Sequence, residues 1–180
     1  MVILQFVKDI LLILMVLFVS LMLITALISI FWVGVPYVPS SSRAIKKILE
    51  LANLKPGQKV YDLGCGDGRF LIEAEKHSKI EGFGYEIAPI PYLLGHIFKV
   101  FNNSKIKIFL KDFSKISLNQ ADIIYCYLGP DATQKAATKA FNECKKGTKI
   151  ITNTFKIQNK QPIFTFQQQA KFPSIYIYEI

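Results

Sequence analysis

The fold is constrained most by one stretch, Val60 to Gly68, which has the sequence VYDLGCGDG. Its first residues are typical of the end of a buried strand. Glycines at alternate positions, Gly64, Gly66 and Gly68, then predict a tight turn that leads into a helix beginning at Arg69. A backbone without Cβ atoms can bend sharply, admit a ligand to its amides and direct a helix N-terminus at that ligand. The stretch therefore predicts a strand, a turn and a helix that bind a nucleotide-like ligand.

The acidic residue ahead of the glycines narrows the chemistry of that ligand. A pyrophosphate-binding turn expects glycine where this chain has Arg69, and the phosphates would be repelled by Asp62. S-adenosylmethionine has no phosphate, and its sulfonium and amino groups are cations that carboxylates attract. The spacing therefore favours S-adenosylmethionine over a pyrophosphate-bearing cofactor.

An acidic residue followed by Gly-x-Gly-x-Gly is the first motif of the class I S-adenosylmethionine-dependent methyltransferases, which this chain resembles. The resemblance implies that Glu86, at the end of the next strand, holds the ribose, because a carboxylate accepts hydrogen bonds from two vicinal hydroxyls. It also implies that Asp112, after a third strand, lies near the adenine amino group. The expected cofactor-binding residues are Asp62, Gly64, Cys65, Gly66, Gly68, Glu86 and Asp112. The alternative is a structural turn with incidental acids.

A run without charge or proline, from Ile10 to Val35, predicts one transmembrane helix. A helix of that length measures about 39 Å, which exceeds the ~30 Å hydrocarbon core of a bilayer. Trp32 and Tyr37 lie near its end, where aromatic residues favour the membrane interface. A cleaved signal peptide is one alternative, although the run is long for one and no Ala-x-Ala-like site follows. A buried core helix is the other, although the run has no polar face.

Charges on either side of this run predict its orientation. Lys8 and Asp9 nearly cancel before it, whereas Arg43, Lys46 and Lys47 follow close behind it. Because cytoplasmic flanks carry the excess of positive charge, the C-terminal domain is expected to face the cytoplasm. S-adenosylmethionine is made there, which agrees with the expected cofactor.

Cysteines and histidines give no sign of a metal site. Cys65, Cys126 and Cys144 have unrelated spacings, so neither disulfides nor zinc is expected. His77 and His96 fall in predicted helices without a partner motif, and we expect both to be structural or to face solvent.

The segment before the first strand carries a second resemblance. Two prolines within 36–42 predict an extended link, and serines behind them can cap an amphipathic helix that ends near Ala52. This order of motifs, from Pro36 to Asp131, resembles the membrane-anchored protein-lysine methyltransferases that modify ATP synthase subunit c and the adenine nucleotide translocase. The expected organisation is an N-terminal tail (1–9), a transmembrane helix (10–35), a linker (36–42) and a methyltransferase domain (43–180).

Strands and helices alternate along that domain, which predicts an α/β fold with a doubly wound, Rossmann-like methyltransferase sheet. After the first motif, strands are expected at 82–87, 106–110, 122–127 and 149–154, and helices at 69–76, 89–101 and 131–145. Two antiparallel strands at 163–167 and 174–179, with a turn at Phe172-Pro173, complete the expected sheet.

The formal net charge is +9, from 22 Lys and Arg against 13 Asp and Glu. Several of the acids fall at or just after the ends of predicted strands, the edge at which ligands of open α/β sheets bind. We therefore expect an acidic rim on a basic body, which suits a cationic cofactor and attracts anionic lipid headgroups of the bilayer. Nucleic-acid binding is a competing interpretation, but no basic-aromatic motif stands out, so no nucleic-acid partner is expected.

The methyl acceptor is expected to face the segment after the fourth strand, from Tyr125 to Asp131. With lysine as the acceptor, Tyr127 could orient its amine, and Asp131 could hold the amine or act through water. The alternative assigns Tyr127 to the core and makes Asp131 a helix cap. The sequences Asn-Pro-Pro-Tyr and Asp-Pro-Pro-Tyr do not occur here, which argues against methylation of adenine or glutamine.

The sequence thus predicts a single-pass membrane-anchored methyltransferase that modifies lysine in a membrane protein. The roughly seven residues between Val35 and Arg43 can span at most ~25 Å, so the active site is expected to stay close to the bilayer. Methylation of a lipid or another small membrane-resident molecule is one alternative. A cofactor-binding module that has lost catalysis is the other.

Overall fold

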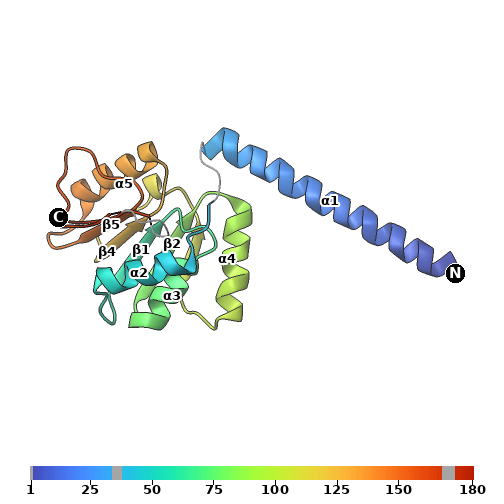
Figure 1. The fold of residues 1–180 in the computed structure, drawn as a ribbon, viewed down its shortest axis with the longest axis horizontal. Coiled ribbons are helices and arrows are strands. Elements are labelled where there is room, and N and C mark those ends of the chain that lie inside the picture. Colours follow the sequence, from blue (N-terminus) through green and yellow to red (C-terminus); the bar gives the residue numbers. More distant parts are fainter. Residues whose placement is uncertain (1, 34–37, 168–172) are drawn as a thin grey trace. The chain divides into compact units, whose positions relative to one another are not determined.

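The computed structural model describes residues 2–33, 38–167 and 173–180 of the chain. The chain divides into two compact units, Met1–Tyr37 and Val38–Ile180 (Figure 1). The end of the expected membrane span at 34–35, the first two linker residues and Phe172 of the expected turn lie outside the described residues.

The first unit contains one long helix, α1 (Val2–Val33). It begins at Val2, so residues expected to form a tail are helical as well. Its segment Gln5–Ile24 has a mean hydropathy of 2.6 and no buried side chain. By length and composition α1 can cross a membrane.

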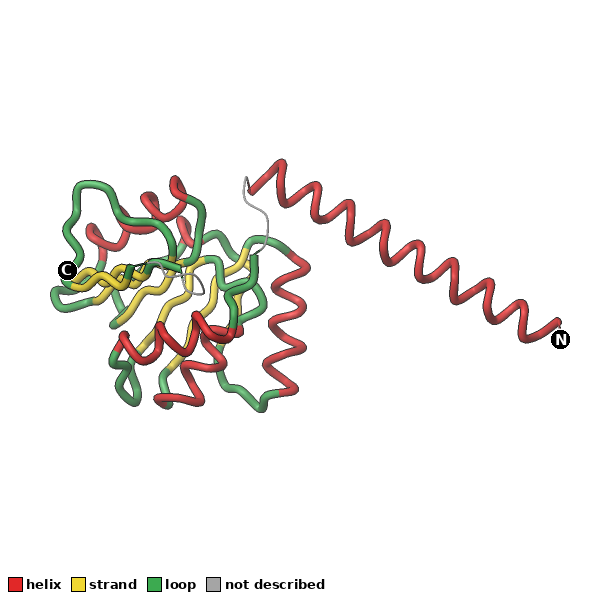
Figure 2. Tube along the Cα trace, in the orientation of Figure 1, coloured by secondary structure: helices red, strands yellow, loops and turns green. Residues whose placement is uncertain are grey.

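The second unit is built on a seven-stranded sheet in the order β3-β2-β1-β4-β5-β7-β6 (Figure 2). Its strands are β1 (Lys59–Leu63), β2 (Glu81–Glu86), β3 (Lys107–Leu110), β4 (Ile123–Cys126), β5 (Lys149–Asn153), β6 (Phe164–Phe166) and β7 (Ile175–Glu179). Neighbouring strands from β3 to β5 are parallel, whereas β7 is antiparallel to both β5 and β6. The prediction of a doubly wound sheet ending in two antiparallel strands is confirmed.

Helices cover both faces of this sheet (Figure 1). One face is covered by α2 (Ser42–Ala52), α3 (Arg69–Ser78) and α4 (Pro89–Phe101), and the other by α5 (Pro130–Glu143). A short 3-10 turn, η1 (Phe113–Lys115), replaces a helix between β3 and β4. Ser41 caps α2, as expected of the serines before it, because its Oγ accepts a hydrogen bond from the Ala44 amide at 3.2 Å.

An apolar core lies on each face of the sheet. On the first face, Phe70 of α3 stacks on Tyr125 of β4 with ring centroids 3.9 Å apart, and both side chains are buried. On the second face, the small side chains of Ala136 and Ala140 let α5 lie close to the sheet. These contacts fix the ends of β1, β2, β3 and β4 at one edge of the sheet, called the carboxyl edge from here on.

Candidate active site

The glycine turn leaves β1 in a backbone conformation that side chains disfavour. Gly64, Gly66 and Gly68 have φ angles of +78°, +56° and +72°. A Cβ atom on Gly64 would also collide with the Leu128 side chain, and one on Gly68 would lie 2.8 Å from Cδ1 of Ile108. Glycine is therefore required here by conformation and by space. The predicted strand, turn and helix are present, with α3 starting at Arg69.

Glu86 is fixed against this turn by backbone hydrogen bonds. Its Oε2 accepts from the Gly66 amide at 2.8 Å, and its Oε1 accepts from the amides of Ile87 and Ala88 at 2.9 and 2.8 Å. Only 8% of the residue is exposed. Each carboxylate oxygen has more than one lone pair, so Glu86 can still accept hydrogen bonds from ligand hydroxyls. The predicted ribose-binding residue thus lies beside the turn in a fixed orientation.

Asp62 is buried beside the same turn. The residue is 2% exposed, and among the described residues no hydrogen bond reaches its carboxylate. Burial, reinforced by the negative charges of Glu86 and Asp67, raises the pKa of Asp62 well above its ordinary value. A cation placed here would offset both effects. The sulfonium and amino groups of S-adenosylmethionine have the charge that this position lacks, so the cofactor fits the residues present.

Asp67, the third carboxylate, is neutralised within the chain. Its Oδ1 and Oδ2 each accept a hydrogen bond from Nε of Arg69 at 2.9 Å. Nη1 of the same guanidinium donates to the Ser40 carbonyl at 3.3 Å, and Ser40 Oγ lies 3.4 Å from the Tyr125 hydroxyl. Arg69 therefore joins the cofactor turn to the point where the N-terminal segment enters the domain, a role that sequence reasoning missed.

Asp112 lies at the same edge, and one of its two carboxylate oxygens caps the short helix η1. The Lys111 amide donates to the Glu86 carbonyl at 2.9 Å, which places the chain after β3 beside the end of β2. Asp112 is half-buried, and its Oδ1 accepts from the Ser114 amide at 2.8 Å, capping η1. The second carboxylate oxygen, Oδ2, does not take part in this cap and can accept a hydrogen bond from an adenine amino group.

Cys65 contributes its main chain to the glycine turn and does not present a reactive thiol there. Its amide and that of Gly64 both donate to the Tyr85 carbonyl, at 3.1 and 2.8 Å. Its Sγ packs where a Cβ on Gly84 would otherwise stand, 2.6 Å away. Burial, followed by the nearby charges of Asp62 and Glu86, raises the pKa of the Cys65 thiol well above its ordinary value. The side chain therefore fills the core, and only the main chain of this predicted residue lies in the turn.

The two predicted acceptor-side residues follow β4, beside the end of β1. Tyr127 is half-buried and packs against the first core. Asp131 is exposed in the first turn of α5, where a negative charge favours the helix N-terminus. The cap position belongs to Gly129, so the alternative assignment of Asp131 as the helix cap is wrong.

Asn153, at the end of β5, was not among the predicted site residues. It ends β5, is 2% exposed, and donates from Nδ2 to the Tyr125 hydroxyl at 3.3 Å. The next residue, Thr154, has a φ of +76°, which is strained for a branched side chain. A polar residue directly after a buried apolar strand is the signal that could have identified it, because such strands end at the ligand edge.

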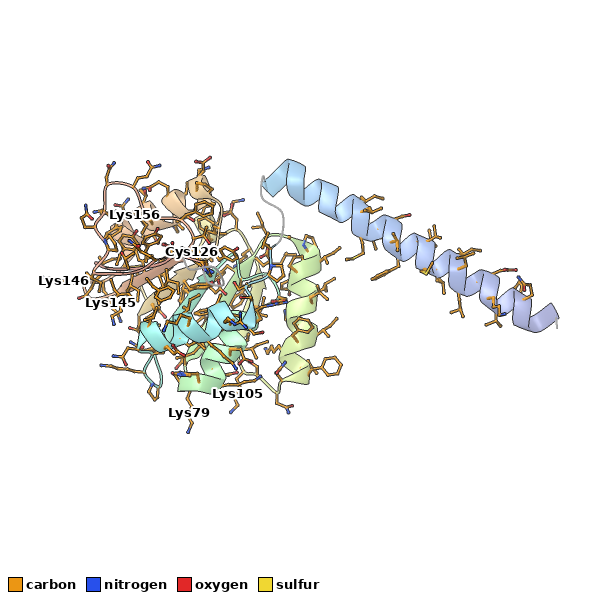
Figure 3. The ribbon with its side chains drawn as sticks, in the orientation of Figure 1. Lys79, Lys105, Cys126, Lys145, Lys146 and Lys156 are labelled. Carbon is orange, nitrogen blue, oxygen red and sulfur yellow. The ribbon has the colours of Figure 1, made fainter. Side chains whose placement is uncertain are left out.

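Three acidic side chains lie together at the carboxyl edge of the sheet. Asp62, Asp67 and Glu86 meet at the carboxyl edge, as the acids at predicted strand ends suggested. Lys79 and Lys105 are exposed, precede β2 and β3, and lie at the foot of the domain in Figure 3. The carboxyl edge is therefore the part of the domain suited to a cation.

The two histidines contact neighbouring side chains. His77 Nδ1 lies 2.7 Å from Ser78 Oγ, and the His96 ring packs edge-on against Tyr92 at a centroid distance of 4.6 Å. Within 2–33, 38–167 and 173–180, no group of three His, Cys, Asp or Glu side chains is arranged to hold a metal ion. Cys144 is half-buried, while Cys126 is buried.

Comparison with known proteins identifies the family. A family model described as ANTKMT methyltransferase domain matches residues 62–164. The chain is 28% identical over 151 residues to a protein-lysine N-methyltransferase of Saccharolobus islandicus, covering 81% of this chain and 94% of that protein. It is 30% identical over 133 residues to the adenine nucleotide translocase lysine N-methyltransferase of Mus musculus, covering 72% of this chain and 57% of the mouse protein.

A solved structure matches the fold and bears on the cofactor. An RNA methyltransferase from Salinibacter ruber, in complex with S-adenosyl-L-homocysteine, superposes with a TM-score of 0.75 at 25% identity, covering 79% of this chain and 94% of that one. S-adenosylhomocysteine is what remains of S-adenosylmethionine after methyl transfer. Together with the match over residues 62–164, this establishes that the chain belongs to the ANTKMT methyltransferase family and is a class I S-adenosylmethionine-dependent methyltransferase.

Proposed function

We propose that this chain is a membrane-anchored protein-lysine N-methyltransferase whose acceptor is a membrane protein. The observation that carries the proposal is the match along 94% of the Saccharolobus islandicus protein, which is named for lysine methylation. The mouse relative is named for lysine methylation of the adenine nucleotide translocase. Both names point to a lysine side chain as acceptor, and the second points to a protein partner at a membrane.

The chemistry assigned to the carboxyl edge is a direct methyl transfer. S-adenosylmethionine, when bound, supplies a methyl group already activated by its sulfonium sulfur. The glycine turn, Asp62 and Glu86 position that group, and Asp112 is proposed to contact the adenine. Methyl transfer to the lysine nitrogen would break the carbon–sulfur bond, leave its electron pair on sulfur and yield S-adenosylhomocysteine.

The acceptor amine must lose a proton before it can attack. A neighbouring sulfonium charge and partial burial both lower the pKa of a lysine amine. We assign Tyr127 to orient the amine through its hydroxyl. Asp131, which is exposed in the first turn of α5, is assigned to attract the ammonium form and to pass its proton to water.

The membrane part of the proposal rests on α1. Gln5–Ile24 is long and apolar enough to span a bilayer, and the basic residues that follow the run favour a cytoplasmic catalytic domain. A tether of this kind raises the effective concentration of the site for acceptors in the same membrane and lowers it for soluble ones. An uncleaved anchor, rather than a signal peptide, is therefore part of the proposal.

One labelling experiment separates the possible acceptors. Native membranes are incubated with the full-length enzyme and cofactor carrying a labelled methyl group, and the label is then traced in protein, lipid and RNA. The RNA fraction is included because the Salinibacter ruber enzyme is an RNA methyltransferase. We expect label in protein hydrolysates as methylated lysine, and less of it with Glu86→Ala at a cofactor concentration near the wild-type Kd. Label confined to lipid or RNA would contradict the proposal.

A further inference from the structure

The outer face of α4 is unlike that of the other long helices in the catalytic domain. Leu93, Ile97, Val100 and Phe101 are 57%, 47%, 74% and 82% exposed. At 100° per residue these four positions fall within an arc of about 100° on one side of the helix. The opposite side carries the buried Pro91 and Gly95. In Figure 3 the side chains of α4 project away from the sheet.

Helices elsewhere in the domain expose polar residues, as surface helices normally do. The exposed positions include Lys46 and Glu50 on α2, Lys76 on α3, and Lys135 and Thr138 on α5. An apolar stripe confined to one helix is therefore a local property of α4. A stripe of this kind marks a contact with another apolar body.

We propose that this stripe, called the α4 outer face, rests in the interfacial layer of the phospholipid bilayer and is a second membrane contact of the enzyme. The inference rests on the proposed anchoring by α1. Amphipathic helices bind membranes in this way, with the apolar side ~5–10 Å below the headgroups. Residues 89–101 include Lys99 and no Asp or Glu, so anionic headgroups meet no negative side chain on this helix.

The length of the connecting chain limits how far Ser40 can lie from the end of α1. Ser40 is held to the domain by Arg69 and Tyr125, at 3.3 and 3.4 Å. Six residues lie between Val33, the last residue of α1, and Ser40, so the two Cα atoms can be at most ~25 Å apart. The bilayer surface is thus never far from Ser40.

The same entry point adjoins α4. A groove is lined by residues from the start of α2, by Phe98 of α4 and by residues of α3 that include Arg69, the hydrogen-bond partner of Ser40. At Gly95, α4 packs so closely on the cofactor turn that a Cβ there would lie 3.3 Å from the carbonyl carbon of Asp67. A bilayer reached through Ser40 therefore lies within reach of the α4 outer face.

The size of the face favours lipid over a second copy of the chain. A helix of 13 residues is ~20 Å long and ~10 Å wide, so its outer face offers ~200 Å². A stable protein interface takes ~800 Å² from each partner. Contact with lipid does not require a minimum buried area of this kind, because the proposed anchor α1 already holds the protein at the membrane.

The test measures how deep α4 lies in vesicles. Full-length protein is reconstituted into phosphatidylcholine–phosphatidylglycerol vesicles with a nitroxide at Ile97→Cys, in a Cys144→Ser background that removes the one partly exposed thiol. A nitroxide at Thr138→Cys, on α5, is the matched control. Collisions with oxygen, which enters lipid, are compared with collisions with a water-soluble nickel complex.

We expect the Ile97 label to collide more with oxygen than with nickel, and the Thr138 label to show the reverse. Adding Val100→Glu should expose the Ile97 label to the nickel complex, because a charged side chain on the α4 outer face opposes its burial in lipid. Cofactor binding should be retained. Equal nickel access at both sites would overturn the proposal. So would protection that appears only at high protein-to-lipid ratio, which indicates a second copy, or only with an acceptor protein present.

Alkaline extraction of the same vesicles distinguishes this inference from the anchoring on which it rests. Protein that stays in the pellet while the Ile97 label is open to nickel contradicts only the α4 contact. Protein released into the supernatant contradicts the anchoring and, with it, the α4 contact.

Discussion

At the scale of single residues, Asp62 is the proposed link between the fold and the cofactor. A buried carboxylate without a hydrogen bond is costly when ionised, and two further carboxylates stand nearby. Asp67 has Arg69 as a partner and Glu86 has three backbone amides, whereas Asp62 has neither among the described residues. A bound cation would offset this cost, so we propose that Asp62 both destabilises the free enzyme and favours a cationic ligand.

The free enzyme should therefore lose stability as the pH rises. Burial holds the pKa of Asp62 above its unfolded value, so its contribution is fully present below the unfolded pKa and is lost as the pH rises through the folded pKa. Asp62→Asn removes this loss. Denaturant unfolding of the cofactor-free protein in detergent, followed across pH, should give a flatter profile for the variant than for the wild type.

Asp122 provides a control of opposite sign. Partial burial opposes the shift, but hydrogen bonds from Lys145 and from the Lys59 amide lower the pKa of Asp122. Its stabilisation is present above the unfolded pKa and is lost as the pH falls through the folded value. Asp122→Asn should therefore flatten the acid side of the profile only. Identical profiles for both variants would contradict the burial assigned to Asp62.

Cofactor binding should weaken when either carboxylate is removed. Asp62→Ala and Glu86→Ala are each expected to cost ~1–3 kcal/mol of S-adenosylmethionine affinity through lost charge-assisted hydrogen bonds. Calorimetry measures the effect, with Glu50→Ala as the control, because Glu50 is exposed on α2 and pairs with Lys47. Unchanged affinity in both variants, or equal affinity of the wild type for NAD, would contradict the site.

The acceptor-side assignment makes a kinetic prediction. Tyr127→Phe and Asp131→Ala should lower turnover and leave cofactor affinity nearly unchanged, because both residues are assigned to the amine. If Asp131 only interacts with the α5 dipole, Asp131→Ala would instead cost ~0.3–1 kcal/mol of stability without a change in turnover. Parallel measurement of kcat and thermal unfolding distinguishes these outcomes.

At the scale of elements, the turn after β1 determines the position of the site. Gly64 and Gly57 have nearly equal φ angles of +78° and +76°, but only Gly64 lacks space for a Cβ atom. Gly57→Ala should cost ~1–2 kcal/mol through backbone strain alone. Gly64→Ala should cost more, through the additional collision with Leu128, and should also weaken cofactor binding. Equal losses in thermal unfolding would show that the collision is relieved by movement of Leu128.

Several elements could be predicted from the sequence because local signals determined them. Glycines at alternate positions gave the turn, and serines before an amphipathic pattern gave the cap of α2. The contact of Arg69 with Ser40 could not be predicted, since it joins residues 29 apart that no local pattern relates. The α4 outer face was also missed, because the large apolar side chains of a helix are normally expected to pack on the core, whereas here the small Pro91 and Gly95 are the buried residues.

At the scale of the whole molecule, the proposed enzyme consists of a membrane anchor and a catalytic domain. Full-length protein should remain in membranes after high-salt and alkaline washing. The apolar segment Gln5–Ile24 would be held by burial in the hydrocarbon core, which neither salt nor alkali disrupts, rather than by ionic contacts with headgroups. A chain beginning at Val38 should be released by the alkaline wash. Release of the full-length protein by salt alone would contradict a transmembrane anchor.

The central claim is that the enzyme methylates lysine in a membrane protein near the bilayer surface. The most direct test is mass spectrometry of membrane and soluble proteins from cells that contain the wild-type enzyme, the Glu86→Ala variant or no enzyme. We predict methylated lysine that is abundant with the wild type, reduced with Glu86→Ala and absent without the enzyme, in an integral membrane protein, within ~25 Å of the cytoplasmic surface. Enzyme-dependent methylation confined to soluble proteins, or the absence of any enzyme-dependent methyllysine, would contradict the account.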